Sequence, residues 1–264
     1  VQGGYQLENE ADGIEGYISD ANKGAFTEIR GMQEAKVEDE QNMNNGTTYI
    51  LNSPIMPSAR SVYSILSNNG AEDSEYFSAF YNLCQDDEEI IEKCGLVDEN
   101  LTSSQKKSEK KKYTIFTDIK GPSQGVQFFS NYQYTIFVPS NDAIEEAISN
   151  GLPTWEDIRA DYEASLNEEG FVSTQEDSIR LQAKITYLTN FLRYHFADQS
   201  VFVDKSTFLG RDYVTASYDN EKGLFCKVQM QRPQSDVLQV KDCSDGEWLT
   251  VSDEVNNLMA RDVA

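Results

Sequence analysis

Residues 134–144 read YTIFVPSNDAI, and this stretch predicts a strand that runs directly into a helix. Its first part is rich in β-branched and aromatic residues, which are typical of strands, and we expect the strand to deliver Phe137 to the core. Pro139 has no N–H and therefore ends the ladder of hydrogen bonds. Ser140 and Asn141 can satisfy the unpaired backbone donors at the start of the helix.

Helical patterns occur mainly before residue 200 and strand patterns after it. Apolar residues recur at helical spacing in three segments: Tyr76, Phe77, Phe80, Tyr81 and Cys84; Ala143, Ile144, Ala147 and Ile148; and Leu181, Ile185, Leu188 and Leu192, with Tyr187, Phe191 and Tyr194 widening the last buried stripe. Strands are expected at 113–119, 134–138, 201–203, 213–217, 224–230, 237–240 and 248–251. This order predicts an α+β fold.

The balance of charge is strongly acidic. The chain has 264 residues, with 22 Lys and Arg against 45 Asp and Glu, which gives a net charge of −23. Such a chain repels phosphate backbones and anionic bilayers, so nucleic acid is not an expected partner. The one basic run, KKSEKKK at 106–112, ends a segment from residue 99 that we expect to be a loop. The run is either a solvated part of that loop or a contact for anions such as polysaccharide sulfate.

Histidine and cysteine usage predicts no metal site and no cofactor. The spacings of Cys84, Cys94, Cys226 and Cys243 match no zinc pattern, and three disulfide pairings remain open beside four free thiols. His195 is the single histidine. No apolar run is long enough to span a bilayer, and we expect any targeting segment to have been removed before residue 1.

Two segments carry a resemblance to the fasciclin (FAS1) domain family. Residues 134–144 resemble the family's first motif, and LTNFLRYHF at 188–196 resembles its second motif, a helix that ends in Tyr-His before a strand, here 201–203. Shorter matches to the family's helices lie at 61–66 and 77–80, and 257–263 resembles a segment before the final strand. The resemblance implies a fasciclin-like α+β fold, a twisted β-sandwich or wedge with several helices packed on it.

The resemblance also implies a division of the chain. The family's usual final strand is not found after residue 263, but a segment of that type stands at 45–52. We therefore expect 1–56 to be the tail of a preceding fasciclin domain plus a linker, and 57–264 to be a fasciclin domain without its last strand. Alternatively, residues 47–51 fill the empty strand position, in the same or a neighbouring molecule.

A fasciclin domain of this type implies a non-catalytic adhesion or partner-binding module. Acidic tandem members resemble outer-membrane lipoproteins, so we expect the cell surface or the periplasm, with a lipid anchor outside this chain. The expected partner is a protein or a polysaccharide, with self-association through an open sheet edge. One alternative is a glycan-capture accessory that stacks sugars on Trp155, Trp248 and tyrosines; a hydrolase with a carboxylate pair is less favoured. Tyr194 and His195 are the candidate binding residues, with a structural role as their alternative.

Overall fold

The computed structural model describes a mixed α+β protein in which most helices precede most strands. The residues it describes are 37–44, 46–51, 66, 72–117, 125–129, 134–199, 201, 211–234, 237–243 and 246–251. Within them the order is β1 (Val37–Met43), β2 (Gly46–Leu51), α4 (Glu72–Leu83), α5 (Glu88–Lys93), α6 (Ser103–Lys110), β3 (Tyr134–Ile136), α7 (Asn141–Ser149), α8 (Trp155–Ala164), α9 (Gln175–Tyr194), β4 (Phe196–Asp198), β5 (Asp212–Asp219), β6 (Leu224–Gln234), β7 (Val237–Asp242) and β8 (Leu249–Thr250). The α+β class expected from the sequence is confirmed, whereas the fasciclin-like sandwich stays a prediction.

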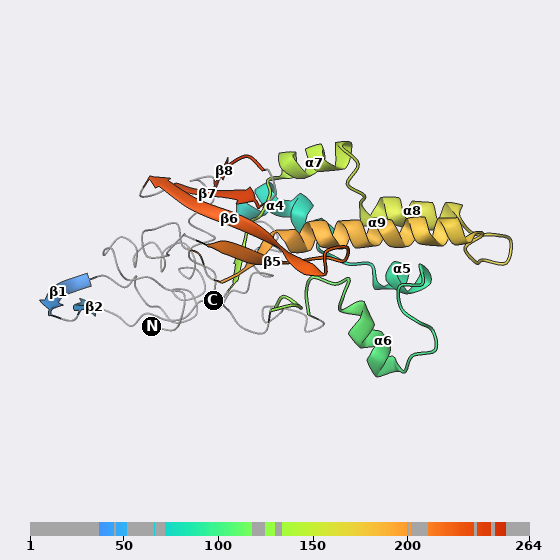
Figure 1. The fold of residues 1–264 in the computed structure, drawn as a ribbon, viewed down its shortest axis with the longest axis horizontal. Coiled ribbons are helices and arrows are strands. Elements are labelled where there is room, and N and C mark those ends of the chain that lie inside the picture. Colours follow the sequence, from blue (N-terminus) through green and yellow to red (C-terminus); the bar gives the residue numbers. More distant parts are fainter. Residues whose placement is uncertain are drawn as a thin grey trace.

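The main sheet is a curled, antiparallel sheet of six strands whose spatial order follows the sequence, from β3 to β8. Its first pair joins Tyr134 to Asp198 and Ile136 to Phe196. The long strands β5 and β6 cross the middle of the sheet (Figure 1). The strands expected at 213–217, 224–230, 237–240 and 248–251 correspond to β5, β6, β7 and β8.

The strand expected at 47–51 lies in β2, but its partner is not the main sheet. β2 pairs antiparallel with β1, with Thr48 opposite Gln41, and the two form a sheet of their own. Within the molecule, therefore, the structure does not bear out the idea that this segment fills an empty position in the main sheet. The division into 1–56 and 57–264 stays a prediction.

The helices that carry the first motif and the long apolar stripe form as expected. Ser140 caps α7 by accepting a hydrogen bond from the N–H of Ala143, and Ile144 is fully buried in the core. Ala143 itself is exposed. Thr174 caps α9, and the face of α9 that points to the core contributes a buried stripe of Leu181, Ile185, Leu188, Thr189 and Leu192. Each fully buried Leu or Ile adds about 1.5–3 kcal/mol of hydrophobic stabilisation.

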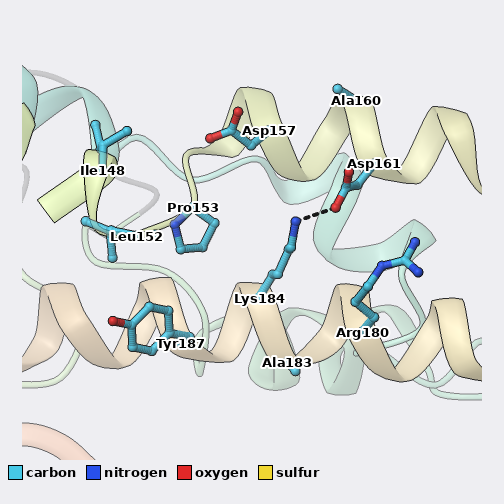
Figure 2. A pocket seen from close by; sticks show the side chains of 11 residues that line it. Ile148, Leu152, Pro153, Asp157, Ala160, Asp161, Arg180, Ala183, Lys184 and Tyr187 are labelled. Atoms are coloured by element: carbon cyan, nitrogen blue, oxygen red, sulfur yellow. Dashed lines mark hydrogen bonds and ion pairs between the residues drawn. The ribbon is translucent and has the colours of Figure 1, made fainter.

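Tyr187 differs from the prediction, because it does not widen the buried stripe of α9. Its side chain is 56% exposed. Apolar periodicity assigns a helical face only to within one residue position, about 100° of rotation. Tyr187 precedes the buried Leu188 and lies on the side of α9 that faces α8 (Figure 2).

The segment expected to be a loop at 99–112 contains α6 instead. Thr102 and Gln105 form a reciprocal capping box at its first turn. Lys, Gln and Glu are also strong helix formers, so the local sequence favours a helix once it is capped. The prediction of a loop was wrong because it relied on the run of charged residues and did not weigh the capping box and the helix propensity.

Two of the expected strands are not formed in the described residues. In the segment 113–119, residues 113–117 contain one isolated bridge, Phe116 to Val126, and the rest lies outside the described residues. Val201 is buried but belongs to no strand; the strand after the Tyr-His pair is β4, which pairs with β3 and β5. The helix match at 61–66 and the match at 257–263 also lie outside the described residues, apart from the buried Leu66.

The helices pack around α9, which is the longest of those described. α8 lies along α9, and α5 contacts both α6 and α8 (Figure 1). The other end of α9 leads directly into β4 and contacts β5. None of the described helices combines the length and hydrophobicity that a membrane span requires.

Candidate functional site

The Tyr-His pair at the end of α9 lies where the helix layer meets the sheet. Tyr194 is the last residue of α9, and His195 is its C-cap, immediately before β4. The backbone N–H of Phe137 donates to the His195 carbonyl oxygen at 2.9 Å. The two fasciclin-like motifs, far apart in sequence, therefore meet at this point.

The imidazole of His195 is held in an aromatic environment. Its ring makes edge contacts with Phe80 and Phe191, with centroid distances of 5.3 and 4.8 Å. Its Nδ1 lies 2.8 Å from the Phe191 carbonyl oxygen, so Nδ1 carries the proton and donates. Burial lowers the pKa of His195 to about 4, against a smaller opposite effect of the Phe191 carbonyl. At neutral pH the ring is uncharged and one nitrogen is engaged by backbone, which is the arrangement expected of a structural histidine.

The hydroxyl of Tyr194 is also engaged within the protein. It lies 2.6 Å from Asp242 Oδ2 and 3.1 Å from the Lys227 carbonyl oxygen. Its single proton goes to the carboxylate, because a charged acceptor forms the stronger bond. Burial raises the pKa of the Tyr194 phenol, and the hydrogen bond to Asp242 raises it further. Tyr194 thus ties α9 to strands β6 and β7.

The remaining motif residues hold the start of α7 in place. Asn141 accepts a hydrogen bond from the N–H of Ala79 at 2.9 Å and donates to Ser78 Oγ at 3.1 Å, both on α4. Phe137 is only partly buried, and it packs against a cluster of buried apolar side chains. Pro139 follows the end of β3. The Asn was expected to satisfy its own helix, but here it joins two helices.

A groove lies between α8 and α9. It has a volume of about 560 Å³ and is open to solvent. Its lining residues are Ile148, Gly151, Leu152, Pro153, Asp157, Ala160, Asp161, Arg180, Ala183, Lys184 and Tyr187. Figure 2 shows the ring of Tyr187 on α9 near Pro153, with the charged residues farther along both helices.

The charged residues of the groove are paired with one another or with helix caps. Lys184 forms an ion pair with Asp161 across the groove (Figure 2). Asp157 accepts from the backbone N–H and the hydroxyl of Thr154, and these bonds lower the pKa of its carboxyl. Arg180 pairs with Asp177 at 2.7 Å. The groove therefore presents an apolar half and a charge-balanced half.

Trp155 and Trp248, which were expected to stack on sugars, are both engaged by other groups of the protein. The indole N–H of Trp155 donates to the Leu83 carbonyl oxygen at 2.9 Å, and its ring packs on the core. The ammonium of Lys241 lies 5.0 Å from the ring centroid of Trp248. Tyr187 offers the more accessible ring, and this could not be predicted because α8 and α9 meet only in the fold.

The four cysteines are free thiols in the structure. Cys84 and Cys94 are buried, and Cys226 and Cys243 are partly exposed. Burial raises the pKa of the Cys84 thiol, and it raises that of Cys94 to about 11. Both buried thiols are therefore protonated and unreactive at neutral pH. In the described ranges, no group of three or more His, Cys, Asp or Glu side chains could hold a metal ion.

Comparisons of the chain with models of known protein families, with curated proteins and with solved structures gave no match. The resemblance of 134–144 and 188–196 to fasciclin motifs therefore stays a prediction from those residues.

Proposed function

We propose that this chain is a non-catalytic binding module of the fasciclin type, which contacts a partner at the cell surface through the α8–α9 groove. The observation that carries the proposal is Tyr187, a large aromatic side chain that lines the groove and is 56% exposed. Exposed tyrosines beside an apolar hollow are typical anchors of binding surfaces. The groove is open enough to admit a loop of a partner protein or one sugar ring.

The chemistry of the groove favours binding over catalysis. A general acid needs a carboxyl whose pKa is raised towards neutrality. Here Asp157 has the opposite shift, because Thr154 hydrogen-bonds its ionised form. Asp161 is held by Lys184, so its charge is already compensated. His195 lies outside the groove, with Nδ1 engaged by backbone. These pairings position the helices and leave the carboxylates poorly suited to hydrolysis.

A second candidate, glycan capture, is favoured by the same ring. Sugars stack their apolar faces on aromatic rings while nearby polar groups bond their hydroxyls. Tyr187 with Asp161 and Lys184 offers this combination within one groove. On this reading the sugar platform is Tyr187, in place of Trp155, which is held by the Leu83 carbonyl.

The test compares Tyr187→Ala with Tyr218→Ala, the same change at another exposed tyrosine in β5. The wild-type chain is screened on a glycan array and, separately, against cell-surface proteins by cross-linking and mass spectrometry. We expect Tyr187→Ala to weaken the affinity for the identified partner at least tenfold, about 1.4 kcal/mol. Tyr218→Ala should leave that affinity unchanged. Tyr187→Ala should cost less than about 0.5 kcal/mol of stability. Tyr218→Ala should cost about 1 kcal/mol, because it removes a ring that packs edge-on against Phe225 of β6.

The outcome of the two arms separates the candidates. A glycan hit that depends on Tyr187 selects glycan capture, and a protein hit with that dependence selects adhesion. Binding that survives Tyr187→Ala would remove the groove from the proposal. Turnover of chromogenic glycosides or esters by the wild-type chain would contradict a non-catalytic role.

A further inference from the structure

We propose that the lysine-rich face of α6 is a binding site for the sulfate or phosphate esters of a short anionic glycan. The proposal concerns a surface separate from the α8–α9 groove and does not depend on it. It rests on three observations: the lysines share one face, their charge is not balanced locally, and the end of their helix is anchored to the core.

The lysines come together because α6 is a helix and not a loop. Lys106, Lys107, Lys110 and Lys111 are spaced i, i+1, i+4 and i+5, which places them on one side of the helix. All four line a hollow of about 470 Å³, together with Glu88, Glu92, Ser103 and Thr114. This volume fits one or two sugar rings with their ester groups.

The charge in this hollow is positive although the chain is strongly acidic. Lys110 bonds both carboxylates of the hollow, Glu88 at 3.0 Å and Glu92 at 2.7 Å, and its side chain is only 19% exposed. One ammonium group offsets one of these two negative charges, and the four lysines of the hollow outnumber its two glutamates. Lys106 and Lys111 form no ion pair with any described residue, although Lys106 contributes to lowering the pKa of Asp98. Their ammonium groups remain available to an anion.

The C-terminal end of α6 would by itself repel an anion, because the helix dipole places partial negative charge there. Arg193 of α9 counteracts this effect. Its Nη2 donates to the carbonyl oxygens of Lys111 at 2.8 Å and Thr114 at 3.4 Å. Its guanidinium also lies 5.1 Å from the ring centroid of Phe128, and burial lowers its pKa to about 10. Arg193 forms no ion pair with a described carboxylate, so it adds positive charge beneath the site.

The acidic surface elsewhere limits the length of the ligand. At physiological salt the Debye length is about 8 Å, so a short oligosaccharide in the hollow is screened from distant carboxylates. A long polyanion would extend onto acidic surface and be repelled. Lysine ammonium groups bond sulfate and phosphate oxygens through charge-assisted hydrogen bonds. A short glycan that carries a few esters therefore fits the site better than nucleic acid does.

The test measures fluorescence anisotropy with a labelled sulfated tetrasaccharide, the same tetrasaccharide without sulfate, and a phosphorylated tetrasaccharide, at 50 and 150 mM NaCl. The double variant Lys106→Glu/Lys111→Glu reverses the charge at the two lysines that form no ion pair with a described residue. The matched control is Lys112→Glu/Lys222→Glu, since Lys112 pairs with Glu109 outside the hollow and Lys222 pairs with Asp219. Circular dichroism confirms that each variant is folded.

We expect the wild-type chain to bind an esterified probe, the double variant to bind it at least about tenfold more weakly, and the control to stay within about threefold. Binding should also weaken as salt rises. Tighter binding of the sulfated probe assigns the site to sulfated glycans, and tighter binding of the phosphorylated probe assigns it to phosphorylated ones. No binding of either ester at 50 mM, equal binding of the unsulfated probe, or an equal loss in the control would overturn the proposal.

Discussion

His195 makes the stability of this protein depend on pH between about pH 4 and pH 6.5. It is the only histidine in the chain, and its folded-state pKa is about 4 because its ring is buried against Phe80 and Phe191. In the unfolded chain the pKa returns to about 6.5. Below pH 6.5 the unfolded state therefore binds a proton that the folded state resists.

The sign and size of the effect follow from this difference. Above pH 6.5 both states are neutral at this residue and stability does not change. As the pH falls below 6.5, protonation of His195 stabilises the unfolded state. By linkage, the free energy of unfolding falls by about 2 kcal/mol at pH 5 and by about 3 kcal/mol at pH 4. Such a loss is a large fraction of the 5–15 kcal/mol that stabilises an ordinary domain, about a fifth or more.

The assay uses urea unfolding at pH 7.5 and pH 5.0 for the wild-type chain and for His195→Gln. Carboxylates also titrate over this range, but they contribute equally to both chains and cancel in the difference. We expect the wild-type chain to lose about 2 kcal/mol more than the variant does. In parallel, the Hε1 resonance of the single histidine reports its folded-state pKa directly. A Hε1 titration midpoint near 6.5, or equal pH dependence in both chains, would contradict the burial of a neutral imidazole.

Three further changes test the packing of the motif residues by urea unfolding at pH 7.5. Asn141→Ala should cost about 2 kcal/mol, because it removes two hydrogen bonds that join α7 to α4; a loss below about 0.5 kcal/mol would show that the bonds are dispensable. Gly151→Ala should cost about 1–2 kcal/mol, since φ is +102° and only the backbone conformation opposes a Cβ there. Gly125→Ala, also in open space but without a positive φ, should be neutral, and equal effects would contradict the strain argument. Tyr194→Phe should cost about 2 kcal/mol by leaving Asp242 without its phenol donor, and an unchanged midpoint would place that carboxylate in water.

The parts of the fold that could be predicted are those with local signals. Residues 134–144 contain both the strand pattern and the Ser140 cap, and α7 begins at the next residue. The stripe of α9 is a repeat within one helix, so no tertiary knowledge was needed to find its buried leucines. The strands β5 to β8 are separated by turn residues such as Asp219-Asn220, which are local signals as well.

The parts that could not be predicted depend on residues far apart in sequence. β4 has three residues and becomes a strand only through its pairing with β3 and β5. The groove forms where α8 meets α9, and the sequence of neither helix predicts it. The candidate site therefore moved from the Tyr-His pair to Tyr187, about two helical turns earlier on α9. α6 is different, because the capping box of Thr102 and Gln105 is a local signal that predicts a helix. The lysine run favoured a loop instead, and that prediction was wrong.

The sequential order of the six strands has a consequence for how the chain folds. β5, β6, β7 and β8 are neighbours both in sequence and in the sheet, so their hairpins close over short loops and can form early. β3 must wait for its partner β4, because α7, α8 and α9 lie between them. We expect β3 to join the sheet late, when α9 is docked and β4 is in place. Refolding would then show a slower phase in which β4 is the exposed edge of the sheet, and proteins at high concentration could pair through that edge before β3 covers it.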